Sequence, residues 1–249
     1  MSVSAPVFFT EARRLIDWVE QTQMPKIQEG ARLLAESLAK EGVVHIFGTG
    51  HSQAFAMEMA GRAGGLVPMD MISLQDLCSR AGLPWSVLED PTLERDPQWG
   101  LKVLATHDVR PQDAFVIVSN SGRNGSTVEM ALEVKRRGLP LIVVTSMAHS
   151  REVASRHPSG KKLYDIGDVV MDNGGPYGDA MLEMEGTGSK VCAVSSITGA
   201  MIAQGLTAEI TRLLLLQGMT PPVLVSANVD GSDEWNNRLR EKYRGRITA

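Results

Sequence analysis

The sequence predicts a three-layer α/β protein, with a mainly parallel β-sheet covered by helices on both faces. Short apolar runs of strand-like composition lie at residues 43–47, 114–118, 141–145 and 168–171. Segments of about ten residues that favour helix, at 52–62 and 127–137, follow the first two of these runs. Strands that alternate with helices favour parallel pairing, because each connecting helix crosses over the sheet.

An N-terminal helical pair is expected before the first strand. Leu15 and Val19 fall on one apolar helix face, and Pro25 is expected to begin a second helix. We assign residues 1–42 to this pair, which we expect to form part of an oligomer interface, and residues 43–249 to the main domain.

The other segments are less regular. Residues 66–112 contain five prolines and are expected to combine a strand with short helices and surface loops. Residues 158–188 are rich in glycine and predict a loop. A long helix is expected over residues 189–217, ended by Gly218 and Pro221.

Charge and composition argue against a nucleic-acid or membrane partner. The chain has 25 basic and 29 acidic residues and a net charge of −4, so no global positive field attracts polyanions. An anionic ligand would therefore need a local site. The two cysteines form no CxxC motif, the N-terminus has no signal-peptide pattern, and the apolar runs are too short to span a bilayer. We expect a globular cytoplasmic protein.

The first motif is GTGHS, which spans Gly48 to Ser52 and lies between a predicted strand and a predicted helix. Glycines at positions 48 and 50 let the backbone approach an anion, and helix N–H groups donate to it. Gln53 stands where the dinucleotide-binding pattern GxGxxG needs its third glycine, and no P-loop pattern occurs. For this motif alone, a purely structural turn remains an alternative.

The second motif, SNSGRNGST, also joins a predicted strand to a predicted helix. Its polar side chains are Ser119, Asn120, Ser121, Asn124 and Ser126. Capping the following helix would require only one of them. Because the carboxyl ends of parallel strands face one crevice, the two motifs predict a shared binding site for an anion.

The two motifs together resemble a known family. IFGTGHS followed by IVSNSGRN is similar to the paired phosphate loops of the SIS (sugar isomerase) domain, whose second loop typically has the pattern SxSGxT. Ser119, Ser121 and Gly122 match that pattern, whereas Asn124 replaces the usual Thr or Ser. The resemblance covers roughly residues 40–215. It is greatest to stand-alone bacterial SIS proteins of unsettled function, and phosphoheptose isomerases resemble the chain more distantly.

This resemblance implies a five-stranded parallel sheet, a sugar-phosphate ligand and sites formed between subunits. We therefore expect a homo-oligomer, with a dimer favoured, and no cofactor. The reaction implied is aldose–ketose isomerisation through an enediol. The phosphosugar-binding residues expected from the two loops are Gly48, Gly50, His51, Ser52, Ser119, Asn120, Ser121 and Asn124.

An enediol reaction needs a base beside the sugar's reacting carbons. Glu58 is the first candidate, because its helix begins at the first loop; a solvent-exposed carboxylate is the alternative. Glu183 is the second, entering from the C-terminal side or from a partner subunit; the alternative is an acidic residue that only favours a helix start. His157 lies in a polar loop that either closes over the anion or is simply solvated.

Several further alternatives stay open. A non-catalytic sugar-phosphate sensor or a sugar-phosphate lyase would use the same loops. A serine hydrolase is disfavoured, because no histidine follows His157 to complete a late triad position. His45, within a strand, is expected to be a hydrogen-bonded core residue. The histidines have no metal-binding spacing, so we expect no metal site.

Overall fold

A computed structural model of the chain, described here for residues 3–247, confirms the predicted sheet. Five strands pair in parallel in the order β2-β1-β3-β4-β5. The strands are β1 (Val44–Gly48), β2 (Met69–Ile72), β3 (Ala114–Val118), β4 (Leu141–Thr145) and β5 (Val169–Asp172). The four runs predicted as strands agree with β1, β3, β4 and β5 to within one residue at each end.

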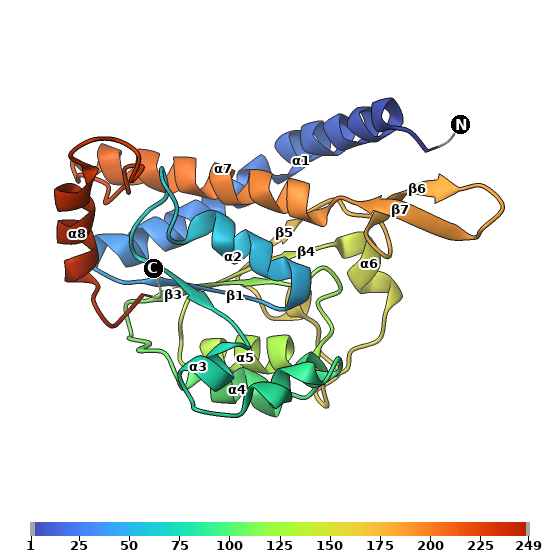
Figure 1. Cartoon of the computed structure of the whole chain (residues 1–249), viewed down its shortest axis with the longest axis horizontal. Helices are drawn as coiled ribbons and strands as arrows, with labels where there is room; N and C mark the ends of the chain where they lie inside the picture. The colour runs from blue at the N-terminus through green and yellow to red at the C-terminus, as the bar shows by residue number, and fades with distance from the viewer. Residues whose placement is uncertain (1–2, 248–249) are drawn as a thin grey trace.

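Helices cover both faces of this sheet (Figure 1). One layer contains α1 (Ala5–Ala39), α2 (Gln53–Met59) and α7 (Ser195–Leu216), and the other contains α3 (Asp76–Ser79), α4 (Gln98–Leu104) and α5 (Gly125–Arg136). Each layer packs its own apolar core against the sheet. A short helix, α6 (Met147–Glu152), follows β4, and 3₁₀ turns occur at Gly50–Ser52, Trp85–Glu89, Leu93–Arg95 and Leu163–Asp165.

The predicted N-terminal pair is in fact one continuous helix, α1, with Pro25 in its interior. A proline removes one backbone hydrogen bond and commonly kinks or ends a helix. Here Pro25 is exposed, while Val19 and Ile27 on either side of it are buried in the same core. Gly30 lies so close to the sheet that a Cβ there would be 2.5 Å from the Met171 side chain. Burial on both sides of Pro25 therefore outweighs its local cost.

The long helix predicted over residues 189–217 is also corrected. Ser189–Ala193 forms strand β7, which pairs antiparallel with β6 (Ala180–Met184), and α7 begins only at Ser195. The hairpin extends away from the sheet (Figure 1). A further helix, α8 (Ser232–Lys242), was not predicted; the segment around it closes a small core in which Tyr243 packs near Val43.

Helix α7 is long and apolar enough, with a mean hydropathy of 1.2, to pass a test for membrane spans by length and composition. The core helix of a globular protein passes the same test, and Ile202, Leu206 and Ile210 of α7 are fully buried in the core. Away from this buried face, residues 3–247 leave apolar side chains of α7 uncovered: Met201 and Leu216 are exposed by 47% and 72%.

Other large apolar side chains are exposed on the neighbouring elements of this layer, namely Phe9 on α1 and Met57 on α2. We predict that a second copy of the chain covers this surface, in agreement with the oligomer expected from the sequence. Light scattering at micromolar concentration should give the mass of a dimer or a larger assembly. Met201→Glu should weaken association by about 10- to 100-fold, because it would bury a charge.

Asn237→Glu, on an exposed position of α8, is the matched control and should leave the mass unchanged. A monomeric wild-type protein, with or without ligand, would contradict this prediction.

Candidate functional site

The first polar loop follows β1 in a conformation that only small residues allow. A Cβ at Gly48 would lie 2.7 Å from the carbonyl oxygen of Ser52, and Gly50 has a φ of +54°. The chain then makes a 3₁₀ turn over Gly50–Ser52 and enters α2 at Gln53. The glycines of the GTGHS motif therefore turn the backbone tightly, and they bring His51 and Ser52 to the carboxyl end of the sheet.

The second loop leaves β3 beside the first. Gly122 has a φ of +61° and packs against the Thr145 and Ser150 side chains. The hydroxyl of Ser119 accepts a hydrogen bond from Gly122 N–H at 3.2 Å, so its own proton remains available to a ligand. Helix α5 starts at Gly125, directly after Asn124, and its N-terminus therefore opens at this loop.

The two loops line one open cavity of about 240 Å³. Seven of the eight predicted binding residues are part of its wall: Gly50, His51, Ser52, Ser119, Asn120, Ser121 and Asn124. The eighth, Gly48, ends β1 next to the wall without forming part of it. Ser52 and Ser119 are 67 residues apart in the sequence, yet both line this one cavity.

A carboxylate that sequence reasoning missed lies between the two loops. Glu94 accepts a hydrogen bond from the Thr49 hydroxyl of the first loop through Oε2. Through Oε1 it accepts one from Asn124 Nδ2 of the second loop, at 2.7 Å. Its backbone oxygen also accepts from Ser126 Oγ at 2.8 Å. No local motif marks Glu94, because it reaches the cavity from the 3₁₀ turn before α4.

The third wall comes from the segments around α6 and the start of α7. Asp179, with a φ of +71°, accepts hydrogen bonds from Ser195 N–H at 2.8 Å and from Ser195 Oγ at 2.7 Å. His149 stands nearby, and its Nδ1 accepts a long hydrogen bond from Gly178 N–H. Burial, together with the positive charge of Arg123, lowers the pKa of His149, so its ring is neutral near pH 7.

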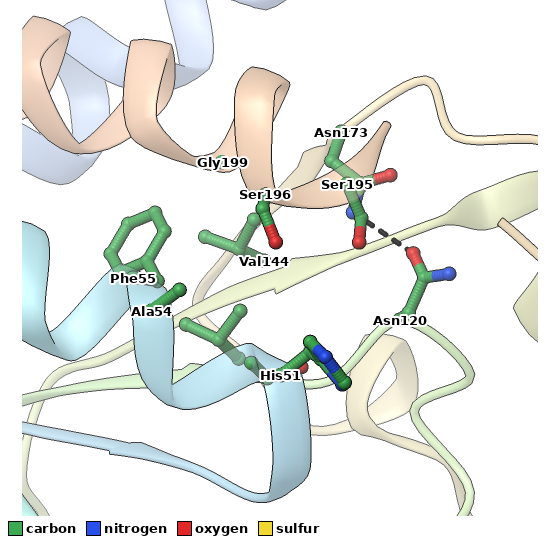
Figure 2. Close-up of a pocket in the computed structure, with 11 residues that line it drawn as sticks. His51, Ala54, Phe55, Asn120, Val144, Asn173, Ser195, Ser196 and Gly199 are labelled. Atoms are coloured by element: carbon green, nitrogen blue, oxygen red, sulfur yellow. Dashed lines mark hydrogen bonds between the residues drawn. The ribbon is translucent and has the colours of Figure 1, made fainter. Parts of the chain in front are cut away.

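A small recess adjoins the cavity and shares His51, Ser52, Asn120 and Ser195 with it (Figure 2). It has about 20 Å³ of free volume, enough for one group of the size of a water molecule. Its polar side is formed in part by Asn173, whose amide donates to Asn120 Oδ1 at 3.0 Å. This bond fixes the amide of Asn120 at the edge of the cavity.

Positive charge gathers behind the second loop. Arg156 Nη1 donates to Asn124 Oδ1 at 2.8 Å, and its backbone N–H donates to the carbonyl of Arg123. Burial lowers the pKa of Arg156, and the neighbouring charges of Arg123 and Arg95 lower it further. The Nε of Arg123 is buried without a hydrogen-bond partner among residues 3–247. An anion at the second loop would relieve the repulsion among these guanidinium groups.

The three residues predicted as catalytic do not line the cavity of the single chain. Glu58 faces α7, where it accepts a hydrogen bond from Gln204 Nε2 at 2.6 Å and pairs with Arg62. Glu183 projects from the hairpin with a side chain 76% exposed. His157 binds Glu129 through Nε2 at 2.5 Å. Helix periodicity and the order of loops in the sequence do not determine where these three side chains point, so sequence reasoning could not exclude them from the cavity.

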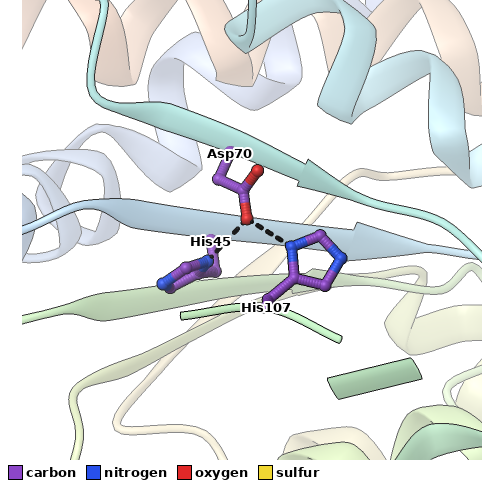
Figure 3. A group of neighbouring side chains, drawn as sticks. All are labelled: His45, Asp70 and His107. Atoms are coloured by element: carbon purple, nitrogen blue, oxygen red, sulfur yellow. Dashed lines mark hydrogen bonds and ion pairs between the residues drawn. The ribbon is translucent and has the colours of Figure 1, made fainter. Parts of the chain in front are cut away.

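Side chains of residue types that can ligate a metal meet in the core, outside the cavity wall. His45 and His107 donate from Nδ1 to the same oxygen, Asp70 Oδ2, at 2.9 and 2.7 Å (Figure 3). Their Nε2 atoms face Asp113 at 3.1 Å and Asp76 at 3.3 Å. This confirms that His45 is a hydrogen-bonded core residue.

Burial by itself would lower the pKa of both histidines, but hydrogen bonds to the flanking carboxylates outweigh it and raise the pKa of each ring. For Asp70 the balance has the opposite sign: burial would raise its pKa, but hydrogen bonds from the two rings lower it. A carboxylate faces each of the four ring nitrogens, and this arrangement favours the protonated form of both rings.

Solved structures with a similar fold include phosphoheptose isomerases. The enzyme from Neisseria gonorrhoeae superposes with a TM-score of 0.54 and 18% identity, over 82% of this chain and 95% of its own. The enzyme from Francisella tularensis also gives a TM-score of 0.54, with 15% identity over the same shares of the two chains. At identities this low, the similarity shows that the fold is shared and nothing more.

Sequence comparison identifies the family of the chain. The SIS domain family matches residues 7–146, more than half of the chain. A UPF0309 protein of Listeria monocytogenes is 41% identical over 96% of this chain and 97% of its own length. A second UPF0309 protein, from Caldanaerobacter subterraneus, is 38% identical over 97% of this chain and 98% of its own. The chain belongs to the SIS domain family and, within it, to the UPF0309 proteins.

Proposed function

We propose that this protein binds a sugar phosphate at the two polar loops and isomerises it between aldose and ketose through an enediol. The observation that carries the proposal is the shared cavity, in which hydroxyl and amide groups of both loops face a carboxylate that joins them. The loop donors suit a phosphate, and the carboxylate suits the transfer of a proton beside a carbonyl group.

The phosphate would lie against the second loop. There it meets the hydroxyls of Ser119 and Ser121 and the first N–H groups of α5, a helix of 12 residues. Ser52 would donate from the first loop. The guanidinium groups of Arg123 and Arg156 add positive charge behind the site, which the near-neutral chain as a whole does not supply.

Glu94 is the base that the geometry favours. Each of its carboxylate oxygens accepts one hydrogen bond from a loop residue, so each keeps lone-pair capacity for a substrate proton. In the proposed reaction Glu94 takes the proton from the carbon next to the carbonyl and returns it to the former carbonyl carbon, while a hydroxyl proton moves between the two oxygens. Glu58 and Glu183 are proposed only as contributors from a neighbouring subunit.

The comparisons support this proposal at a coarser level. The chain belongs to the SIS family, and the phosphoheptose isomerases that share its fold are named for isomerisation of a phosphorylated sugar. A homodimer in the cytoplasm is proposed as the working form. The exposed apolar layer of α1, α2 and α7 supports the dimer, and the burial of one face of α7 in the core supports a water-soluble protein.

Replacement of single loop serines should weaken ligand binding. We predict that Ser52→Ala, Ser119→Ala and Ser121→Ala each cost about 1.5–3 kcal/mol, or about 10- to 150-fold in affinity, because each removes a hydrogen bond to a charged group. Isothermal calorimetry with the best binder from a panel of sugar phosphates measures this. Ser79→Ala, on α3, is the control and should bind like the wild type. Unchanged affinity in all three loop variants would refute the site.

Replacement of Glu94 should separate chemistry from binding. Glu94→Gln keeps the size of the side chain and one hydrogen-bond acceptor, so the sugar phosphate should still bind. Turnover and deuterium exchange at the carbon beside the carbonyl should fall by about 10²–10⁴, the usual contribution of a general base.

Glu58→Gln is the matched comparison, since it changes a carboxylate of the neighbouring helix α2 that does not line the cavity. Exchange that is lost in Glu58→Gln and kept in Glu94→Gln would assign the base to Glu58. A ligand that binds to the wild type without any exchange would favour a sugar-phosphate sensor.

A further inference from the structure

The core cluster around Asp70 joins separate parts of the fold. His45 belongs to β1, Asp70 to β2, and His107 to the connection between α4 and β3. One ligand atom from each of the three residues lies within 4.8 Å of the other two. The cluster is buried: the side chains of His45 and Asp70 are fully inaccessible, and that of His107 is 1% exposed. Three donors from three elements converge with no role in the proposed sugar-phosphate chemistry.

The donor set is one that a divalent transition metal prefers. Two imidazole nitrogens and one carboxylate oxygen are common ligands of zinc. Metal-bound histidines usually donate their second ring N–H to a carboxylate or carbonyl, which fixes the tautomer and the ring orientation. Here Asp113 and Asp76 already stand at the two Nε2 atoms, at 3.1 and 3.3 Å. The outer partners of a metal site are therefore in place around both rings.

The charge of the cluster fits an exchange of protons for metal. Each ring donates from Nδ1 to Asp70 and faces a second carboxylate with Nε2, and Arg246 and Arg80 pair with those two outer carboxylates. If one divalent cation enters and the two Nδ1 protons leave to solvent, the net charge of the buried group does not change. This avoids the large cost of leaving an uncompensated charge in the core.

We propose that His45, Asp70 and His107 form a binding site for one zinc-like divalent cation, which replaces the two Nδ1 protons. Ligand distances of about 2.0–2.2 Å at a tetrahedral ion require nitrogen and oxygen atoms to stand about 3.3 Å apart. The present separations of 2.7 and 2.9 Å would therefore increase by a few tenths of an ångström. His107 lies in a connecting segment rather than in a strand, so its ring can shift by this amount without breaking the pairing of the sheet.

Bound metal would tie the edge strand β2 and the connection before β3 to β1, the strand next to β2. Arg246, near the C-terminus, pairs with Asp113 at 2.7 Å and so joins the same group. The inference does not depend on the proposed sugar-phosphate activity, because no cluster residue lines the loop cavity.

The test is zinc titration of protein freed of metal by a chelator and returned to chelator-free buffer. Calorimetry in two buffers of different ionisation enthalpy should give one site per chain and the release of about two protons for each zinc bound. X-ray absorption of the zinc complex should show two imidazoles, oxygen and no sulfur. Wild-type protein that binds no zinc, or binds it through sulfur or without imidazole, would overturn the proposal.

Variants identify the ligands. His107→Gln should weaken zinc binding by at least about 100-fold, beyond the 10- to 100-fold typical for loss of an outer partner. The double variant His51→Gln with His149→Gln changes the two histidines of the loop cavity and should keep the full affinity. Zinc binding lost in the double variant but kept in His107→Gln would place the metal in the cavity and overturn the proposal. Because absorption is measured on the wild type, the test stands even if His107→Gln fails to fold.

Discussion

The parallel pairing of β1 with β3 is the interaction on which the site depends. Gly48, the last residue of β1, is in register with Val118, the last residue of β3, so both strands end at the same level of the sheet. The loop after each strand therefore opens on the same edge. All five residues of both strands are buried, and a shift of register by one position would misplace side chains against two helical layers at once. Core packing thus fixes the distance between loops that are distant in sequence.

A second constraint brings Glu94 to the same edge. A Cβ at Gly125 would lie 2.1 Å from the carbonyl oxygen of Arg95, and one at Gly100 would lie 2.2 Å from that of Ser126. The 3₁₀ turn and α4 can approach the start of α5 this closely only because both positions are glycine. The close approach sets Glu94 between Thr49 and Asn124. The cavity therefore depends on backbone contacts on the far side of its wall.

The sequence was sufficient to predict those structural features that depend only on residues adjacent in the chain. Strands and loops are local in this sense, since β-branched runs and polar Gly-containing turns carry their own signal. The prediction that a new helix begins at Pro25 was wrong, because residues before and after Pro25 are buried against the sheet and this burial outweighs the hydrogen bond that the proline removes. The β6–β7 hairpin was missed because its strands are short and largely exposed, so they show little burial pattern. Glu94 and the cluster around Asp70 are assembled by the tertiary fold, and no spacing in the chain reveals them.

The carboxylate in the cavity bears on the choice between a sensor and an enzyme. At a separation of about 6 Å and an effective dielectric constant of about 20, a carboxylate and one phosphate charge repel by about 3 kcal/mol. A site that only binds a sugar phosphate gains nothing from that repulsion, and a neutral glutamine could make comparable contacts to the two loops. Proton abstraction, in contrast, needs a basic oxygen close to the sugar carbons. The presence of Glu94 among phosphate-type donors, with Arg123 and Arg156 behind them, therefore favours a catalytic role over a sensory one.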